Sequence, residues 1–111
     1  MSDEDDIDYG LKLSRQHDAN SAYVNRILDR ATWELATAQM RFPQPNYVTL
    51  KVAEEAGEVI KEAVHYAEGR STWEKVEGDV VQMIAMGLRL LVEGDQINGV
   101  KRPVLIFHKM P

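Results

Sequence analysis

The chain has 111 residues and no cysteine, so disulfides and thiolate metal sites are excluded. Its formal net charge of −5 argues against nonspecific binding to nucleic acid. Arg89 interrupts the longest apolar run, so we expect no membrane-spanning helix. The acidic beginning of the chain also differs from a signal peptide, which is basic and then apolar. These features predict a single soluble domain located in the cytoplasm.

Residues 1–20 form a polar, acidic beginning to the chain. The acid is concentrated in Asp3-Glu4-Asp5-Asp6 and Asp8, with only scattered apolar side chains between and after them. We interpret this segment as an N-terminal arm that is mobile or becomes ordered on a partner. Residues 21–95 carry the helical patterns, and residues 96–111 form a C-terminal tail. The apolar run 104–107 in that tail is compatible with a strand, a packing tail or an arm exchanged between subunits.

Two amphipathic helices are predicted in the first part of the helical domain. The first runs from about Ala22 to Met40 on apolar residues at helical spacing, and Pro43 and Pro45 end it. The second begins between residues 46 and 49 and stops at Gly69, a favourable residue just past a helix end. Its apolar stripe lies on one side. A separate arc of about 100° carries Glu54, Glu55, Glu58, Glu62 and His65.

A third helix is predicted from the N-cap residues Ser71 or Thr72 to about Glu93, with Gly94 as its stop. Apolar side chains surround nearly its whole circumference. The polar exceptions form one narrow stripe, made of Asp79, Gln82, Arg89 and Glu93. A helix of this kind is central in a bundle or buried at a subunit contact. We therefore expect an all-α antiparallel helical bundle that is completed by oligomerisation.

The carboxylates of the second helix have two interpretations. Glu55 and Glu58 are three residues apart, so both can reach one hard cation such as Mg²⁺, which prefers oxygen ligands. They are equally compatible with the solvated face of an amphipathic helix. Asp79 favours the metal, because an aspartate among valines needs a partner. It could face Glu55 and Glu58 across a cation, or bond to Arg89, a backbone group or the first helix.

The same residues resemble a known enzyme family. The segment Leu50-Lys-Val-Ala-Glu-Glu-Ala-Gly-Glu-Val-Ile60, followed by Glu77-Gly-Asp-Val-Val81, resembles the MazG-type all-α nucleoside triphosphate pyrophosphohydrolases. Their signature is Glu-Glu-x-x-Glu, a variable gap, and then Glu-x-x-Asp. The resemblance covers roughly residues 30–93. Its first half is complete, whereas Val76 stands where a glutamate three residues before Asp79 is expected.

The resemblance implies a Mg²⁺-dependent enzyme, with Mn²⁺ as a substitute, that cleaves a nucleoside triphosphate into a monophosphate and pyrophosphate. Such an enzyme would clear unwanted nucleotides. Glu55, Glu58 and Asp79 would be the metal ligands, and Glu54 would orient or deprotonate the attacking water. Neighbouring positions supply the candidate substrate-binding residues Gln82, Lys51 and Glu62. The family also implies a homodimer or homotetramer in which a neighbouring subunit completes the cleft.

The departure at Val76 leaves alternatives open. A shifted alignment would use Asp79 and Gln82, or Glu74 and Glu77, as the second half of the signature. A different class of protein would be a non-catalytic helical oligomer that keeps the fold around a degenerate metal site. A third option is an enzyme that acts on phosphoribosyl-ATP, as a related family does.

Overall fold

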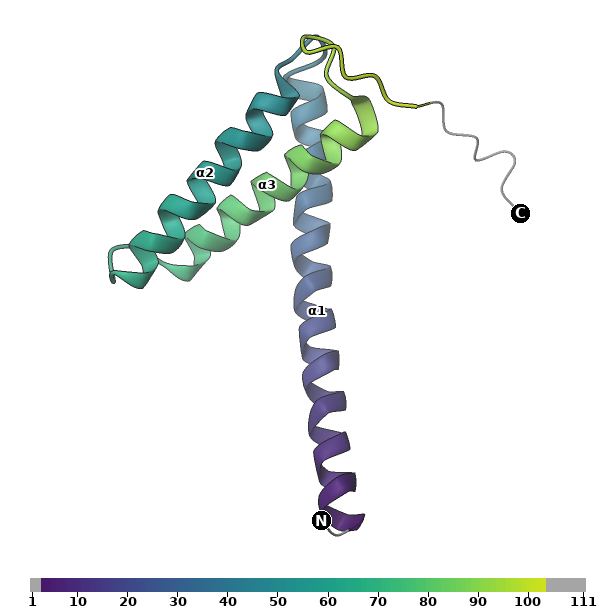
Figure 1. The fold of residues 1–111 in the computed structure, drawn as a ribbon, viewed down its shortest axis with the longest axis vertical. Coiled ribbons are helices and arrows are strands. Elements are labelled where there is room, and N and C mark those ends of the chain that lie inside the picture. Colours follow the sequence, from purple (N-terminus) through teal and green to yellow (C-terminus); the bar gives the residue numbers. More distant parts are fainter. Residues whose placement is uncertain (1–2, 104–111) are drawn as a thin grey trace, which may run out of the picture.

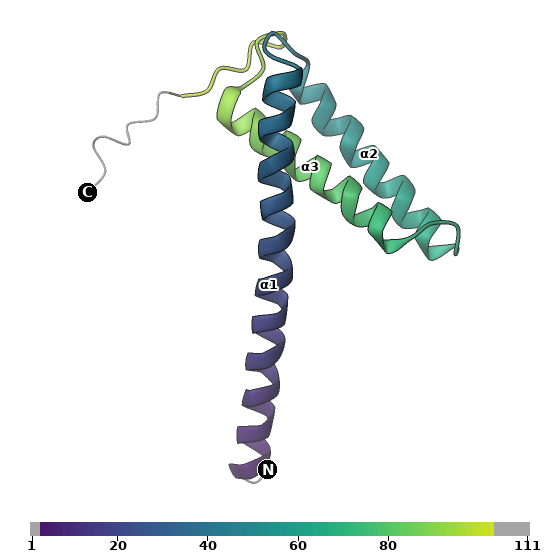
Figure 2. The same cartoon turned by 180° about the vertical axis from the view of Figure 1, so that it is seen from behind.

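The computed structural model describes residues 3–103, which form three helices (Figure 1). They are α1 (Asp3–Arg41), α2 (Val48–Ala67) and α3 (Trp73–Glu93). The hairpin of α2 and α3 is antiparallel, and α1 crosses α3 in both opposite views (Figures 1 and 2). The predicted all-α fold of packed helices is confirmed. Among the described residues, no helix is long and apolar enough to cross a membrane. The apolar run 104–107 lies outside them.

Helix α3 is the central helix, as its apolar circumference predicts. It packs against α2 on one side and against α1 on another. Most of the buried apolar side chains belong to it, and they are Val76, Val81, Ala85 and Met86. Ala31 of α1 and Val48 of α2 complete this core. The helix that carries Asp79 and Gln82 therefore lies between the other two.

The ends of α2 and α3 agree with their sequence signals. The Thr72 side chain accepts a hydrogen bond from the Lys75 backbone N–H at 3.3 Å, which caps the start of α3. Gly94 follows its last residue with a φ of 73°, and Gly69 follows α2 with a φ of 75°. Both angles lie in the left-handed region that glycine adopts without steric cost. Residues next to these helix ends therefore determine where the helices of the hairpin begin and end.

Helix α1 is longer than predicted, because it begins at Asp3 and not near Ala22. The segment expected to be a separate arm is helical and continuous with the rest of α1. Four acidic residues occupy its first turn, where they interact favourably with the positive end of the helix dipole. The apolar periodicity weakens between residues 14 and 21, and a prediction based on that periodicity therefore starts the helix too late.

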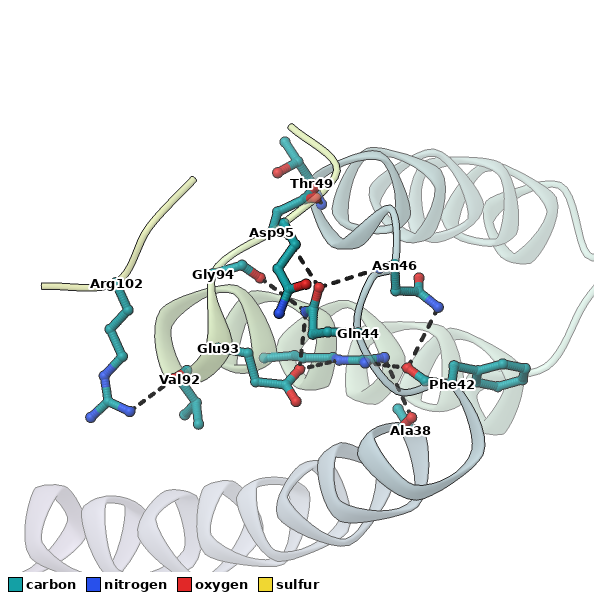
Figure 3. A network of polar contacts seen from close by, with 12 residues as sticks. Ala38, Phe42, Gln44, Asn46, Thr49, Val92, Glu93, Gly94, Asp95 and Arg102 are labelled. Carbon is teal, nitrogen blue, oxygen red and sulfur yellow. Dashed lines mark hydrogen bonds and ion pairs between the residues drawn. The ribbon is translucent and has the colours of Figure 1, made fainter. Parts of the chain in front are cut away.

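Two buried charged residues join the three helices at the end where α1 stops and α3 ends (Figure 3). Arg89 is fully buried, and it donates hydrogen bonds to the Glu93 carboxylate and to the carbonyls of Ala38 and Phe42. Asp95 is also fully buried, and it accepts a hydrogen bond from the Thr49 N–H at 2.8 Å. Asp95 therefore satisfies a backbone N–H in the first turn of α2, and Arg89 donates to a carbonyl just past the end of α1.

Candidate functional site

The acidic arc of α2 faces α3 at the level of Asp79. Glu55 is half-buried, and its pKa is raised first by burial and then by the charges of Glu54, Asp79 and Glu58. The pKa of Asp79 is also raised, by burial and then by the charges of Glu62 and Glu58. Like charges held within electrostatic reach of one another disfavour ionisation. The carboxylates that the sequence places on two helices thus form one negative cluster between them.

A polar pocket of about 260 Å³ adjoins this cluster. All three helices contribute to its walls, which are Glu34, Thr37, Ala38, Arg41, Phe42, Lys51, Glu55, Gln82, Met86 and Arg89. The pocket therefore brings together three of the residues predicted for the site, which are Lys51, Glu55 and Gln82. The Lys51 ammonium lies 4.7 Å from the centre of the Phe42 ring, and this cation–π contact holds it at the pocket.

The other predicted residues are placed differently. Glu54 and Glu58 are exposed on α2 beside Glu55. The Glu62 carboxylate accepts a hydrogen bond from the Ser71 hydroxyl, and this bond is the main reason that its pKa is lowered. Glu62 does not line the polar pocket, although its charge still acts on Asp79. The role of Glu62 in substrate binding stays a prediction.

The alternative partners of the second acidic motif are separated from the cluster. Glu77 accepts a hydrogen bond from the Tyr23 hydroxyl and so belongs to the contact between α1 and α3. Val76 is buried and lines an apolar groove on the same side of α3. Arg89 bonds to Glu93 and to α1, so the alternative of an Asp79–Arg89 bond is wrong. Asp79 and Gln82 are the residues of α3 that remain on the side of the acidic arc.

The described residues hold no group of three or more His, Asp or Glu side chains that is arranged to hold a metal ion. The carboxylates of α2 and Asp79 are electrostatic neighbours without forming such a group. Magnesium differs from zinc in this respect, because it usually keeps several waters and binds through one or two carboxylates plus substrate phosphates. An open set of oxygen donors beside a polar pocket is compatible with that mode of binding.

Sequence reasoning missed the contribution of α1 to the pocket. Glu34, Thr37, Ala38 and Arg41 are spaced by three, one and three residues, which puts them on one face of the helix. This spacing is visible in the sequence, but it mixes acidic, basic and small residues and resembles an ordinary solvated face. Only the crossing of α1 over α3 directs that face towards Glu55 and Gln82.

No protein-family model, curated protein or solved structure matches the chain.

Proposed function

We propose that this protein is a Mg²⁺-dependent nucleotide pyrophosphohydrolase, which hydrolyses a nucleoside triphosphate to a monophosphate and pyrophosphate. The proposal rests chiefly on Asp79 of α3, which lies within electrostatic reach of Glu58 and Glu62 on α2. It rests also on the polar pocket that Glu55 lines together with Lys51 and Arg41. Carboxylates and cations side by side suit a metal-bound phosphate chain, because the metal needs oxygen donors and the phosphates need positive charge. The MazG-like signature on the same residues supports this assignment.

Glu55, Glu58 and Asp79 would hold the metal. A bound Mg²⁺ would supply Lewis-acid polarisation of the phosphate oxygens. Carboxylate oxygens suit this ion in chemical type, and the pKa values of Glu55 and Asp79 are raised first by burial and then by neighbouring carboxylates, whose repulsion a cation would relieve. A site of this kind binds the metal more tightly when substrate phosphates complete its coordination.

The chain's own residues would orient the substrate and the attacking water. Lys51 from α2 and Arg41 from α1 would neutralise phosphate charge in the pocket, and Gln82 would offer an amide for hydrogen bonding from α3. Glu54 is exposed next to Glu55, where its carboxylate would orient a water or accept its proton. In this arrangement most of the rate enhancement comes from positioning and electrostatic stabilisation.

The test is an incubation with Mg²⁺ or Mn²⁺ and a panel of canonical and modified nucleoside triphosphates, with the products separated by chromatography. Monophosphate and pyrophosphate are expected in equal amounts. Glu58→Gln should lower kcat by at least about 100-fold without changing the circular dichroism spectrum. Glu68→Gln is the matched control, because Glu68 is an exposed acid beyond the end of α2 that pairs with Arg70. Equal turnover by both variants would contradict the proposal.

A second candidate is a non-catalytic helical module that keeps this fold. The burial of Val76 at the expected position of an acidic residue favours it. This candidate predicts that no nucleotide yields product and that Mg²⁺ with nucleotide leaves the melting temperature unchanged, because ligands stabilise only the folded state to which they bind.

A further inference from the structure

The loop after α3 contains an asparagine that is followed by a glycine. Asn98 and Gly99 lie in the turn between Asp95 and Val100, which exchange two backbone hydrogen bonds of 2.9 Å each. Both Asn98 and Gly99 are exposed, and Gly99 has a φ of 71°, in the left-handed region that suits glycine. An Asn-Gly pair is favourable in such a turn. It is also chemically reactive, because asparagine is a thermolabile residue.

The backbone nitrogen of Gly99 is accessible to the side chain that precedes it. The nitrogen that follows an asparagine can attack the carbonyl carbon of the asparagine side chain, and a cyclic succinimide forms as ammonia leaves. Glycine obstructs this attack least, because it has no Cβ. Within residues 3–103 the Gly99 N–H donates no hydrogen bond, and nothing beyond its chain neighbours lies within 4 Å of an added Cβ. This part of the chain therefore leaves the nitrogen open to react.

The amide of Asn98 is bonded to a buried carboxylate. Its Nδ2 donates to Asp95 Oδ2 at 2.8 Å, and the Asn98 backbone N–H donates to Asp95 Oδ1 at 3.1 Å. Asp95 also accepts from the Thr49 N–H in the first turn of α2 (Figure 3). Burial alone would raise the pKa of Asp95, but these hydrogen bonds lower it, so Asp95 is ionised at neutral pH. The Asn98 amide thus helps to hold the carboxylate that joins the loop to α2.

We propose that Asn98 is a site of spontaneous deamidation, and that its conversion weakens the contact between Asp95 and α2. In the first step the Gly99 nitrogen bonds to the Asn98 Cγ. The proton of that nitrogen leaves with the side-chain amide group as ammonia, and a succinimide remains. In the second step one water molecule opens the ring at either carbonyl and gives aspartate or isoaspartate. The reaction needs no oxidant or reductant, and the inference is independent of the proposed function.

Both products disturb the present contacts of Asp95. Each replaces the amide donor at position 98 with a carboxylate, which cannot donate when it is ionised and which repels the Asp95 carboxylate. Isoaspartate also adds a methylene group to the backbone of the turn. The base of that turn is closely packed, because the Val100 carbonyl oxygen lies directly against Gly94. We therefore expect either product to weaken the hydrogen bond between Asp95 and Thr49.

The hydrogen bond from Asn98 to Asp95 also limits the rate of the reaction. A side chain held by this bond samples fewer of the rotamers that ring closure requires, so the reaction follows local opening of the loop. Such openings are rare but repeated, whereas the loss of ammonia is not reversed, and the products accumulate. Deamidation should therefore be at least about tenfold slower in the folded protein than in the chain unfolded in urea.

Mass spectrometry of the full chain tests the site. After incubation of the folded protein at mildly alkaline pH, trypsin releases residues 90–101, in which Asn98 is the one asparagine, and residues 16–26. The first peptide should gain the mass difference between OH and NH2 and separate into aspartate and isoaspartate forms. The second is the internal control, because its asparagines, Asn20 and Asn25, lie inside α1 and neither precedes a glycine. Deamidation of Asn98 that is no faster than that of Asn20 and Asn25 would overturn the proposal.

Two substitutions in the turn test the consequence for the fold. Asn98→Asp places a carboxylate beside Asp95, and it should lower the melting temperature at neutral pH by about 4–8 °C. Gln96→Glu is the matched control, since Gln96 is exposed in the same turn and its side chain makes no hydrogen bond within residues 3–103. It adds the same charge and should change the melting temperature by less than about 2 °C. Equal shifts in the two variants would mean that the Asn98 amide does not hold Asp95, which contradicts the proposal.

Discussion

Arg89 illustrates how a single residue connects elements that lie far apart in the sequence. Its guanidinium is fully buried and reaches the Glu93 carboxylate at 2.5 Å, while its other nitrogens bond to carbonyls near the end of α1. A planar group with five donors can satisfy several acceptors at once, which a lysine cannot do in the same geometry. Arg89 therefore fixes the end of α1 on α3, beside the polar pocket that it also lines.

Replacing Arg89 should be among the most destabilising single changes in the chain. Arg89→Ala removes the buried partner of the Glu93 carboxylate and the charged donor to the Phe42 carbonyl, so we expect a loss of about 3–5 kcal/mol in the free energy of unfolding. Equilibrium denaturation in urea measures this loss. Combining Arg89→Met with Glu93→Gln should cost less than Arg89→Met alone, because no unpaired charge then remains. A loss below about 1 kcal/mol for Arg89→Ala would contradict this role.

The sequence alone identifies Arg89 and Asp79 as polar exceptions on an apolar helix, but it does not assign their partners. Hydropathy patterns locate a residue on a helix face, and they carry no information on which backbone carbonyl or carboxylate a side chain meets across a helix crossing. The carboxylates of α2 were foreseeable because they are local in sequence. The contribution of α1 to the polar pocket was not, because it depends on the position and angle of the crossing.

At the scale of elements, the local signals predicted two helices closely and one poorly. The ends of α2 and α3 depend on residues adjacent to them, such as Thr72 and Gly94, and both were correctly placed. The start of α1 was misplaced by about twenty residues, since residues 3–20 lack the apolar stripe of a helix buried in its own chain. This failure is informative, because a helix without an internal packing partner is the kind that periodicity does not reveal.

A comparison of Gly69 and Gly94 distinguishes the cost of backbone strain from the cost of steric crowding. Gly94 and Gly69 have nearly equal φ values of 73° and 75°. A Cβ atom added to Gly94 would lie 2.3 Å from the Val100 carbonyl oxygen, whereas nothing lies within 4 Å of one added to Gly69. Gly69→Ala should cost about 1–2 kcal/mol, the usual penalty of a left-handed residue. Gly94→Ala should cost at least about 1 kcal/mol more, because the loop must move.

Thermal or urea unfolding of both variants, compared at one protein concentration, measures this difference. The close approach of Val100 is part of the contact in which Asp95 and Val100 exchange backbone hydrogen bonds, each at 2.9 Å. Equal destabilisation by the two substitutions would mean that the loop after α3 adapts freely. It would then contribute little to holding Asp95 at the start of α2.

At the scale of the whole molecule, the pKa values of different carboxylates are shifted in opposite directions. Burial alone would raise the pKa of Asp95, but hydrogen bonds from Asn98 and Thr49 outweigh burial and hold that pKa well below its ordinary value of 3.8. Glu55 and Asp79 show the opposite shift, because they are partly buried beside other carboxylates. The molecule thus combines one carboxylate that stabilises the fold when ionised with a cluster that opposes folding when ionised.

These opposite shifts predict how stability depends on pH. Asp95 stabilises the fold above pH 3.8, and this contribution is lost as the pH falls further. Glu55 and Asp79 bind protons more tightly in the folded state than in the unfolded state, so they lower stability as the pH rises through their raised pKa values. In metal-free buffer at fixed ionic strength, we therefore expect the melting temperature to be higher near pH 5 than near pH 7.5.

Glu55→Gln removes one of the interacting charges, so it should raise the free energy of unfolding near pH 7.5 by roughly 0.5 kcal/mol, a value reduced by solvent screening. The same substitution should have no such effect below pH 4, where Glu55 is already protonated in the wild type.

Mg²⁺ should raise the melting temperature of the wild type at pH 7.5 more than that of Glu55→Gln, because a bound cation relieves the same repulsion. A wild-type stability that does not change between pH 5 and pH 7.5 would mean that the carboxylates of α2 and α3 are too well solvated to interact. It would also weaken the case for a cation between them.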